Sequence, residues 1–307
     1  MRPHMHLAVT GANGFVGRHV VAHAVAAGSR VSGIVRSPAA ARVVSEAGGQ
    51  PREVPHPDVD TLARALDGAE AVVHLAQIGA ERGGATYEAV NVGLTEVVLE
   101  ASRRAGVPRI VFFSGLGVAR YGMSRRSTNP YFLSKLTAEG LLLRSDREVS
   151  IFRPSYVVGP GDAFVVAVLE AMARGEVEQP GDGAYRMQPI AVADAAALVL
   201  AAASRPKGSF PVVFDLVGPE PVSHAQLHGR RASVARVEGR RADFRVREIS
   251  IEEADRQAAA GGYQGMLPDE LDCLLCDEVG DPSPLVALLG RPLTPLADAL
   301  AAAVRAA

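Results

Sequence analysis

The chain alternates between short apolar runs and longer segments in which apolar residues recur every three or four positions. The short runs predict buried strands, and the periodic segments predict helices. The expected strands cover residues 6–9, 31–35, 71–75, 110–113 and 149–152, and the expected helices cover residues 16–24, 39–47, 61–66, 87–105 and 131–143. Such regular alternation favours an α/β fold built on a doubly wound parallel sheet.

The regular alternation ends after Pro154. Helix-like segments at 164–174 and 192–203, a loop at 179–183 and a strand-like run at 212–217 follow, and the last third of the chain is mixed. We therefore expect a first domain over residues 1–160, to which segments near 188–217 return. Residues 161–187 and 218–307 are expected to form a smaller lobe.

Composition narrows the class of protein. Hydrophobic residues make up 48% of the 307 residues and charged residues 21%, which is typical of a folded globular chain. The net charge of −2 provides no general attraction for a polyanion, so nucleic acid is not an expected partner. The longest apolar stretch, residues 195–203, is about half of what a bilayer requires, and the first residues show no secretory pattern. We expect a cytoplasmic protein with no membrane partner.

A glycine-rich segment, TGANGFVG at residues 10–17, separates the first expected strand from the first expected helix. Backbone N–H groups at the start of a helix attract a pyrophosphate, and glycine allows the phosphates to come close. The spacing is GxxGxxG rather than the GxGxxG of the general dinucleotide fingerprint, and tight turns use glycine in any case. Its place inside a βαβ unit favours a dinucleotide site. The expected contacts are Gly11, Asn13, Gly14, Phe15, Val16 and Gly17.

The end of the second expected strand distinguishes the two nicotinamide cofactors. An acidic residue about twenty positions after the glycines binds the free 2′-hydroxyl of NAD(H), whereas arginine accommodates the 2′-phosphate of NADP(H). Arg36 and Ser37 stand at this point, and Arg18 follows the last glycine. Because both guanidinium groups could bind one phosphate, the sequence favours NADP(H) over NAD(H). The alternative is that both are solvated surface arginines.

Tyr131 and Lys135 are four residues apart and share one face of an expected helix. A nearby ammonium favours the phenolate, which would lower the tyrosine pKa towards the working range of an acid or base. The chain has only two lysines, Lys135 and Lys207, so a lysine at this position is a stronger indication of function than it would be in a lysine-rich chain. The alternative is a chance YxxxK pattern on an amphipathic helix.

These features together resemble the short-chain dehydrogenase/reductase superfamily, in its extended type, the NAD-dependent epimerase/dehydratase family. The resemblance covers about residues 5–200 and rests on TGANGFVG at 10–17, HLA at 74–76, NVGLT at 91–95, YFLSK at 131–135 and RPSYVVGP at 153–160. It implies a Rossmann-type domain with a C-terminal substrate lobe. It also implies that Tyr131 is the acid/base and that Lys135 binds the nicotinamide ribose. The matched residues Leu75, Ala76, Pro154 and Ser155 are expected to complete the cofactor site.

Three departures from the family pattern bear on the reaction. Ser114 is the candidate for the family's catalytic hydroxyl after the fifth strand, because only Ser114 carries a hydroxyl in the segment 113–117. It stands one or two positions early, and Leu116 occupies the place where that hydroxyl is expected. The Ser-Gly-Leu-Gly wording there resembles an atypical branch related to an accessory subunit of complex I, which includes cofactor-binding members without obvious catalysis. Dehydratases carry an acidic pair where this chain has Leu116-Gly117, and sugar-nucleotide epimerases commonly carry asparagine where Ser155 stands. Dehydration and a UDP-sugar substrate are therefore disfavoured.

Several further residues are candidates for lesser roles. Possible substrate contacts are Gln77, Asn91, Leu116, Tyr185, Arg186 and Gln188, the last three in the loop where the lobes should meet. His74 ends a buried strand and is expected to be structural. Cys273 and Cys276, in an expected helix over 269–279, are too few for a disulfide framework or a zinc site, so no metal is expected. Residues 242–249 alternate like a half-exposed strand with a charged face.

Three functions remain open at this point. The first is an NADP(H)-dependent oxidoreductase that moves a hydride between the nicotinamide and a carbonyl or secondary alcohol of a small molecule. The second is a nucleotide-sugar or related epimerase that retains its cofactor. The third is a cofactor-binding sensor or assembly protein without turnover. A homodimer through the expected helices 87–105 and 131–143 is a further expectation from the resemblance.

Overall fold

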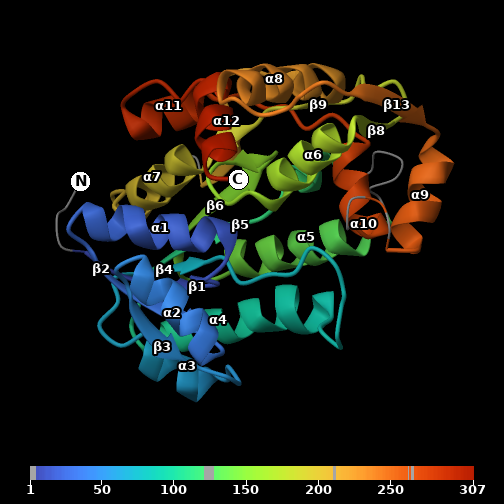
Figure 1. Cartoon of the computed structure of the whole chain (residues 1–307). Coiled ribbons are helices and arrows are strands. Elements are labelled where there is room, and N and C mark those ends of the chain that lie inside the picture. The colour runs from blue at the N-terminus through green and yellow to red at the C-terminus, as the bar shows by residue number, and fades with distance from the viewer. Residues whose placement is uncertain (1–4, 121–127, 210–211, 262, 264–265) are drawn as a thin grey trace.

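A seven-stranded parallel sheet forms the centre of the protein, in a computed structural model that describes residues 5–120, 128–209, 212–261, 263 and 266–307. The strand order is β11-β6-β5-β4-β1-β2-β3 (Figure 1). The strands are β1 (His6–Thr10), β2 (Arg30–Val35), β3 (Gln50–Glu53), β4 (Ala71–His74), β5 (Arg109–Phe113), β6 (Glu148–Pro154) and β11 (Val213–Leu216). The order reverses between β1 and β4, where open parallel sheets bind ligands at the carboxyl ends of the strands. The predicted Rossmann-type doubly wound fold is confirmed.

Helices cover both faces of the sheet (Figure 1). One face carries α1 (Phe15–Ala26), α2 (Pro38–Glu46), α7 (Val192–Ala203) and α11 (Ser283–Leu289), and the other carries α3 (Val59–Ala65), α4 (Leu94–Arg104) and α5 (Pro130–Leu143). Successive side chains of a strand point to opposite faces. Leu7 and Val9 of β1 accordingly pack under α1, while Ala8 packs on the side of α3 and α4.

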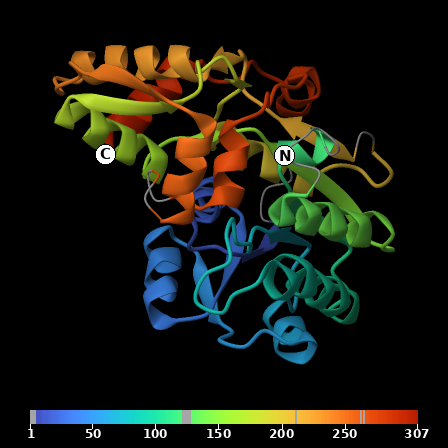
Figure 2. The ribbon, with the colours of Figure 1, turned by 90° about the vertical axis from the view of Figure 1, so that its right-hand side faces the viewer.

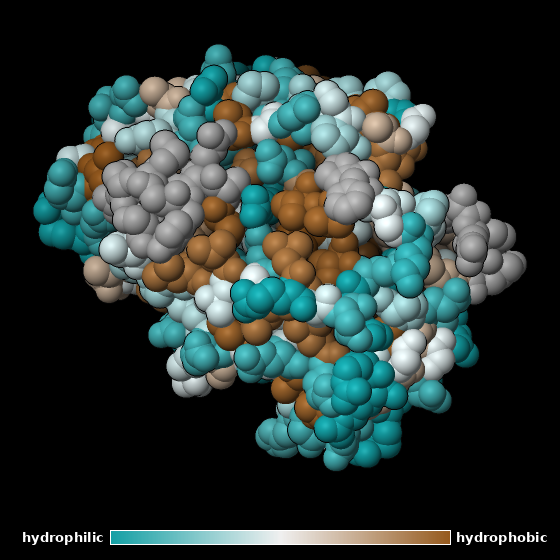
Figure 3. Space-filling model, turned by 180° about the vertical axis from the view of Figure 1, so that it is seen from behind, coloured by the Kyte–Doolittle hydropathy of each residue, from teal (hydrophilic) through white to brown (hydrophobic). Residues whose placement is uncertain are grey.

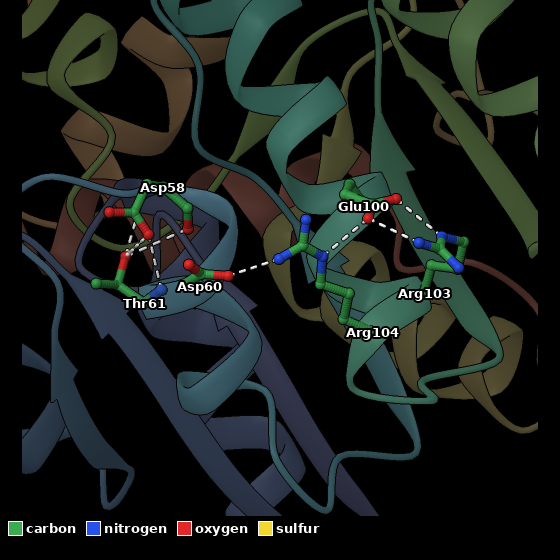
Figure 4. Close-up of polar contacts among 6 residues, drawn as sticks. All are labelled: Asp58, Asp60, Thr61, Glu100, Arg103 and Arg104. Carbon is green, nitrogen blue, oxygen red and sulfur yellow. Dashed lines mark hydrogen bonds and ion pairs between the residues drawn. The ribbon is translucent and has the colours of Figure 1, made fainter.

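Polar contacts fix the outer ends of α3 and α4 (Figure 4). The Asp58 carboxylate accepts the Thr61 N–H at 2.8 Å and caps α3. Arg104 of α4 lies 2.6 Å from Asp60 and 2.9 Å from Glu100. Exposed ion pairs of this kind contribute about 0–1 kcal/mol each, so the apolar core beneath them supplies most of the helix packing.

The remaining elements gather above the carboxyl end of the sheet, where Figures 1 and 2 show them as a second layer. Its helices are α6 (Ala163–Arg174), α8 (His224–Val237), α9 (Ile251–Ala259), α10 (Pro268–Leu271), the 3₁₀ turn η4 (Asp272–Leu274) and α12 (Leu296–Arg305). Its strands are β7 (Val157–Val158), β8 (Glu176–Pro180), β9 (Arg186–Met187), β10 (Ile190–Ala191), β12 (Val222–Ser223) and β13 (Arg245–Ile249). The division of the chain into two domains near residue 160 stays a proposal.

Three local predictions need correction, and one strand was not predicted. The expected helix 87–105 begins as a π-helix, η1 (Glu88–Gly93), before α4. The polar edge strand β3 escaped detection because it is largely exposed, and the expected loop 179–183 begins inside β8. The expected helix 269–279 ends at Leu274, because the Glu278 N–H donates to the Arg186 carbonyl and draws the chain into strand-like pairing.

Among the described residues, no helix is long and apolar enough to cross a membrane. The most apolar one, α7, has 12 residues, which corresponds to about 18 Å at 1.5 Å per residue. The hydrocarbon core of a bilayer is about 30 Å thick.

Candidate cofactor and active site

The glycine loop between β1 and α1 is packed so closely that side chains are excluded. Gly11 has a φ of +67°, and a Cβ there would lie 2.7 Å from the Ala76 nitrogen. A Cβ on Gly17 would lie 2.1 Å from the Gly11 carbonyl oxygen. The helix begins after Gly14, which has no side chain to cap its first N–H groups. Uncapped N–H groups at a helix start suit a pyrophosphate.

A cavity of about 550 Å³ adjoins this loop. It lies at the carboxyl ends of β1, β2 and β4 and is closed on one side by η1 and α4. Its lining includes Thr10, Gly11, Asn13, Gly14, Ile34, Arg36, His56, Leu75, Ala76, Gln77 and Leu94. The cavity thus continues the glycine loop towards the adenosine side of a dinucleotide, and the residues present fit that group.

The two candidate phosphate-binding arginines do not lie together. Arg36 lines the cavity, and Ser37 beside it caps α2 by accepting the Ala40 N–H. Arg18 instead donates to the carbonyl oxygens of Pro160 and Gly161 at 3.2 and 3.1 Å. The expectation that both arginines bind one phosphate is therefore wrong, because Arg18 holds the loop after β7.

A buried hydrogen-bond chain ties β1, β4 and α4 together behind the cavity. Thr10 Oγ1 lies 2.7 Å from His74 Nδ1 and accepts the Ala76 N–H, and His74 Nε2 lies 3.1 Å from Thr95 Oγ1. Since Thr95 donates its own proton to the Asn91 carbonyl, we assign the Nε2 proton to His74, which then accepts from Thr10. Burial, followed by the charge of Lys135, lowers the His74 pKa to about 3. The prediction that His74 is structural is confirmed.

Asn91 continues this scaffold to the helix that carries Tyr131. Its side chain accepts the Ile78 N–H at 2.9 Å and donates to the Ile78 carbonyl and to Ser134 Oγ. Ser134 in turn donates to the Tyr131 carbonyl at 2.7 Å. Because the Asn91 amide is buried and fully used, its predicted role as a substrate contact is wrong.

Lys135 is a buried residue of α5 and is only 1% exposed. Its ammonium donates to the Phe113 carbonyl at 2.6 Å and to Gln77 Oε1, and it lies 4.2 Å from the centre of the Phe112 ring. Burial lowers the Lys135 pKa to about 7, and Glu139 opposes that effect. Near neutral pH, Lys135 is therefore present in both its charged and its neutral form.

Tyr131 opens α5 beside the end of β5. A Cβ on Gly115 would lie 3.6 Å from the Tyr131 hydroxyl, and the Tyr131 ring lies 6.0 Å from that of Tyr87. Burial, followed by the charges of Cys273, Glu278 and Glu270, raises the Tyr131 pKa. The expected lowering by Lys135 is thus wrong, because these effects favour the neutral phenol.

The end of β5 offers no hydroxyl in the predicted catalytic place. Leu116 is buried and begins the 3₁₀ turn η2 (Leu116–Arg120). Ser114 is fully buried, its N–H donates to the Phe152 carbonyl at 2.7 Å, and its Oγ has no partner among the described residues. Neither side chain faces the solvent-accessible side of the site, and Leu116 as a substrate contact is not supported by its burial.

The residues predicted between the lobes serve mainly to join backbone segments. Gln188 donates to the Gly218 carbonyl at 2.7 Å and accepts the Gly280 N–H at 3.0 Å, so its role as a substrate contact is wrong. Arg186 forms an ion pair with Asp277, in which its Nε and Nη2 atoms both donate to Oδ2. Tyr185 packs against the apolar cluster around Leu271.

Ser155, which follows Pro154 at the end of β6, also joins segments. Its hydroxyl donates to the Glu278 carbonyl at 2.8 Å and accepts the Gln188 N–H at 3.0 Å. This arrangement holds residues 188 and 278 at the carboxyl end of β6.

Residues 268–274, which we call the cover segment, lie against Tyr87 and Asn129, the residue that precedes α5. Figure 2 shows this segment between the upper layer and the main sheet. Asn129 donates to Asp272 Oδ2 at 2.8 Å, and the Tyr87 hydroxyl lies 2.9 Å from Asp269 Oδ2 and 2.8 Å from the Gly79 carbonyl. Sequence reasoning missed these contacts, because 140 or more residues separate most of the partners and no short motif marks them.

The comparison with known protein families decides the assignment. The model of the NAD dependent epimerase/dehydratase family matches residues 7–214. The chain belongs to this family. The cavity beside the glycine loop has the position and the lining that a nicotinamide dinucleotide would need.

Relatives within the family differ in what they act on. A 4-hydroxy-2-methyl-3-oxo-4-farnesyl-3,4-dihydroquinoline-1-oxide ketoreductase from Stigmatella aurantiaca is 29% identical, over 65% of this chain and 65% of the relative. A ceramide reductase from Caulobacter vibrioides is 30% identical, over 64% of this chain and 60% of the relative. The match thus spans less than two thirds of the length of either relative.

A solved structure is similar to nearly the whole chain. MoeE5, in complex with UDP-glucose and NAD, is 26% identical with a TM-score of 0.72, over 97% of both chains. The chain therefore shares its architecture with a protein that was solved with NAD and a sugar nucleotide bound together.

Proposed function

We propose that the protein is an NADP(H)-dependent oxidoreductase that moves a hydride between the nicotinamide and a carbonyl or secondary alcohol of a small molecule. The observation that supports this most directly is the position of Tyr131 and Lys135 on α5, with Gln77 reaching from the cavity lining to the Lys135 ammonium. The relatives that are a ketoreductase and a ceramide reductase support the same reaction class.

The protonation of Tyr131 favours the reductive direction. The bound cofactor supplies the hydride. Because the Tyr131 pKa is raised, the phenol keeps its proton at neutral pH and can donate it to the oxygen of a carbonyl substrate. The reverse reaction needs the phenolate, which the burial of Tyr131 and the nearby acidic groups disfavour.

The lining of the cavity supports NADP(H) as the preferred cofactor. Arg36 stands at the carboxyl end of β2, and no aspartate or glutamate occurs among the described lining residues. A guanidinium group there attracts the 2′-phosphate, and no carboxylate is present to bind a free 2′-hydroxyl.

The experiment that tests the proposal compares two variants at one site. Tyr131→Phe removes the proton donor but keeps the ring, so NADPH affinity should persist while turnover falls by about 10²-fold or more. Lys135→Ala should weaken both NADPH binding and turnover, because its ammonium lies next to the cavity. A carbonyl-compound screen that follows NADPH absorbance identifies the substrate. Full activity of Tyr131→Phe would remove this residue from the mechanism.

An epimerase with retained cofactor is the second candidate, and the similarity to MoeE5 favours it. In that reaction the hydride returns to the same substrate, so the nucleotide stays bound. Nucleotide released by denaturing the purified protein, with no net oxidation or reduction of any carbonyl compound, would support this alternative.

A cofactor-binding protein without turnover is the third candidate. The buried Leu116 and the enclosed Ser114 favour it, because both leave a substrate carbonyl without a hydroxyl beside Tyr131. Thermal stabilisation by NADPH without activity on any compound of the screen would support it.

A further inference from the structure

Lys135 depends on very few groups for its charge. Its helix, α5, supplies Tyr131 and Glu139, but the Glu139 carboxylate is bound by Arg153 of β6 at 2.9 and 2.6 Å. Strand β4 supplies His74, whose pKa of about 3 keeps it neutral at ordinary pH.

Strand β5 offers one more acceptor. It provides the ring of Phe112 and the carbonyl oxygen of Phe113. The only other oxygen in direct contact with the ammonium, among the described residues, is Oε1 of Gln77.

Gln77 is held firmly enough to direct this contact. It is an exposed residue of the loop after β4 and lines the cofactor cavity. On one side the Ala76 N–H donates to Thr10, and on the other both backbone groups of Ile78 are bound by Asn91. The backbone is thus fixed on both sides of Gln77, and its side chain bridges the cavity and the lysine.

We propose that Gln77 is a positioning residue for Lys135, holding its ammonium in the charged form at the edge of the cofactor cavity. The inference rests on the proposed function only for its consequence in catalysis. An acceptor oxygen stabilises an ammonium relative to the neutral amine. Loss of the acceptor therefore releases the lysine proton at a lower pH, and a carboxylate in its place retains that proton to a higher pH.

The lysine content of the chain allows a direct measurement. Only Lys135 and Lys207 occur in the sequence, so protein labelled with ¹³C at the lysine ε carbon gives two NMR signals. A Lys207→Arg variant assigns them, and the exposed Lys207 is an internal reference. The titration needs neither cofactor nor substrate.

Three variants test the proposal. In Gln77→Leu the pKa of Lys135 should fall by about one unit, and in Gln77→Glu it should rise by about one to two units, as expected when an acceptor is lost or a negative charge is added. Gln50→Leu, on the exposed edge strand β3, should leave the titration unchanged. Circular dichroism checks that each variant is folded.

The outcome is decided by the two Gln77 variants. If both are folded and titrate at Lys135 as the unmodified protein does, the proposal is overturned. NADPH affinity measured across pH 6–9 then shows the consequence: in Gln77→Leu it should decline at lower pH than in the unmodified protein. A shifted lysine titration together with no NADPH binding would uphold the role of Gln77 and overturn the proposed function instead.

Discussion

At the scale of single residues, the candidate active site contains two groups, Tyr131 and Lys135, whose pKa shifts both favour the neutral form. Burial raises the pKa of Tyr131 and lowers that of Lys135 to about 7. Near neutral pH, Tyr131 therefore carries no charge and Lys135 is only partly protonated. Proton donation by the phenol is favoured, and the charge of the lysine is the quantity that the surroundings must maintain.

Arg36 is predicted to determine the choice of cofactor. Arg36→Asp should weaken NADPH binding about tenfold or more and bring NADH affinity to an equal or higher level, since a charge-assisted hydrogen bond contributes about 1.5–3 kcal/mol. Calorimetry of both cofactors measures this. Arg18→Gln is the matched control, because Arg18 holds residues 160–161 and should not change the ratio of the two affinities. Equal affinities in the unmodified protein would contradict the prediction.

Two buried histidines of α8 should make the protein sensitive to acid. Burial and the neighbouring Arg231 lower the pKa of His224 to about 4 and that of His228 to about 3, below the ordinary 6.5. Between these values the unfolded chain binds more protons, so stability is lost as the pH falls below 6.5. Each histidine contributes a slope of up to about 1.4 kcal/mol per pH unit.

Urea unfolding between pH 7 and pH 5 tests this slope. His228→Gln should reduce the loss of stability over that range, whereas His56→Gln, at an exposed position, should not. An unchanged pH dependence in His228→Gln would show that this histidine does not titrate as its burial requires.

At the scale of elements, a few polar contacts hold the cover segment to the part of the chain that includes Tyr87 and Asn129. Tyr87→Phe removes the contact of the hydroxyl with Asp269 and Gly79. We expect the free energy of unfolding to fall by about 1–2 kcal/mol, as for other buried hydrogen bonds. Hydrogen exchange should increase in residues 268–274 and stay unchanged in β1.

Asp269→Ala should produce the same local change because it removes the acceptor, and Asp298→Ala, at an exposed position of α12, should not. Equal exchange in all three variants and the unmodified protein would mean that these contacts do not hold the segment.

Some elements could be predicted from the sequence and others could not. Strands β1, β4 and β5 are buried on both faces and read as continuous apolar runs, so they were predictable. The exposed strand β3 carries no such signal. Gln188 and Asn91 have side chains typical of ligand contacts, but partners 13 to 92 residues away already use their amides. Such distant pairings leave no trace in local patterns.

At the scale of the whole molecule, the face that carries α4 and α5 suggests self-association. Figure 3, which shows the molecule from behind, has hydrophobic side chains gathered at mid-height. Helix α5 lies on this rear side, which is at the right of Figure 2. Leu136 and Leu143, seven residues apart on α5, are 37% and 49% exposed. We propose a homodimer through these helices.

Light scattering tests the dimer directly. The unmodified protein should have about twice the 32.1 kDa mass of one chain, and a Leu136→Glu and Leu143→Glu double variant should be monomeric. Val237→Glu, which alters an 83% exposed residue of α8, is the control and should remain dimeric. A monomeric unmodified protein at micromolar concentration would refute the proposal.

The return of the chain from the upper layer to the main sheet makes the two layers inseparable. Helix α7 packs along α1, and β11 pairs with β6 to complete the sheet, although both follow residue 190. A fragment that stops near residue 160 would leave the side of α1 that packs on α7 and the outer edge of β6 without cover. The upper layer therefore cannot be exchanged between family members through a single junction, and chimeras need junctions on both sides of each returning segment.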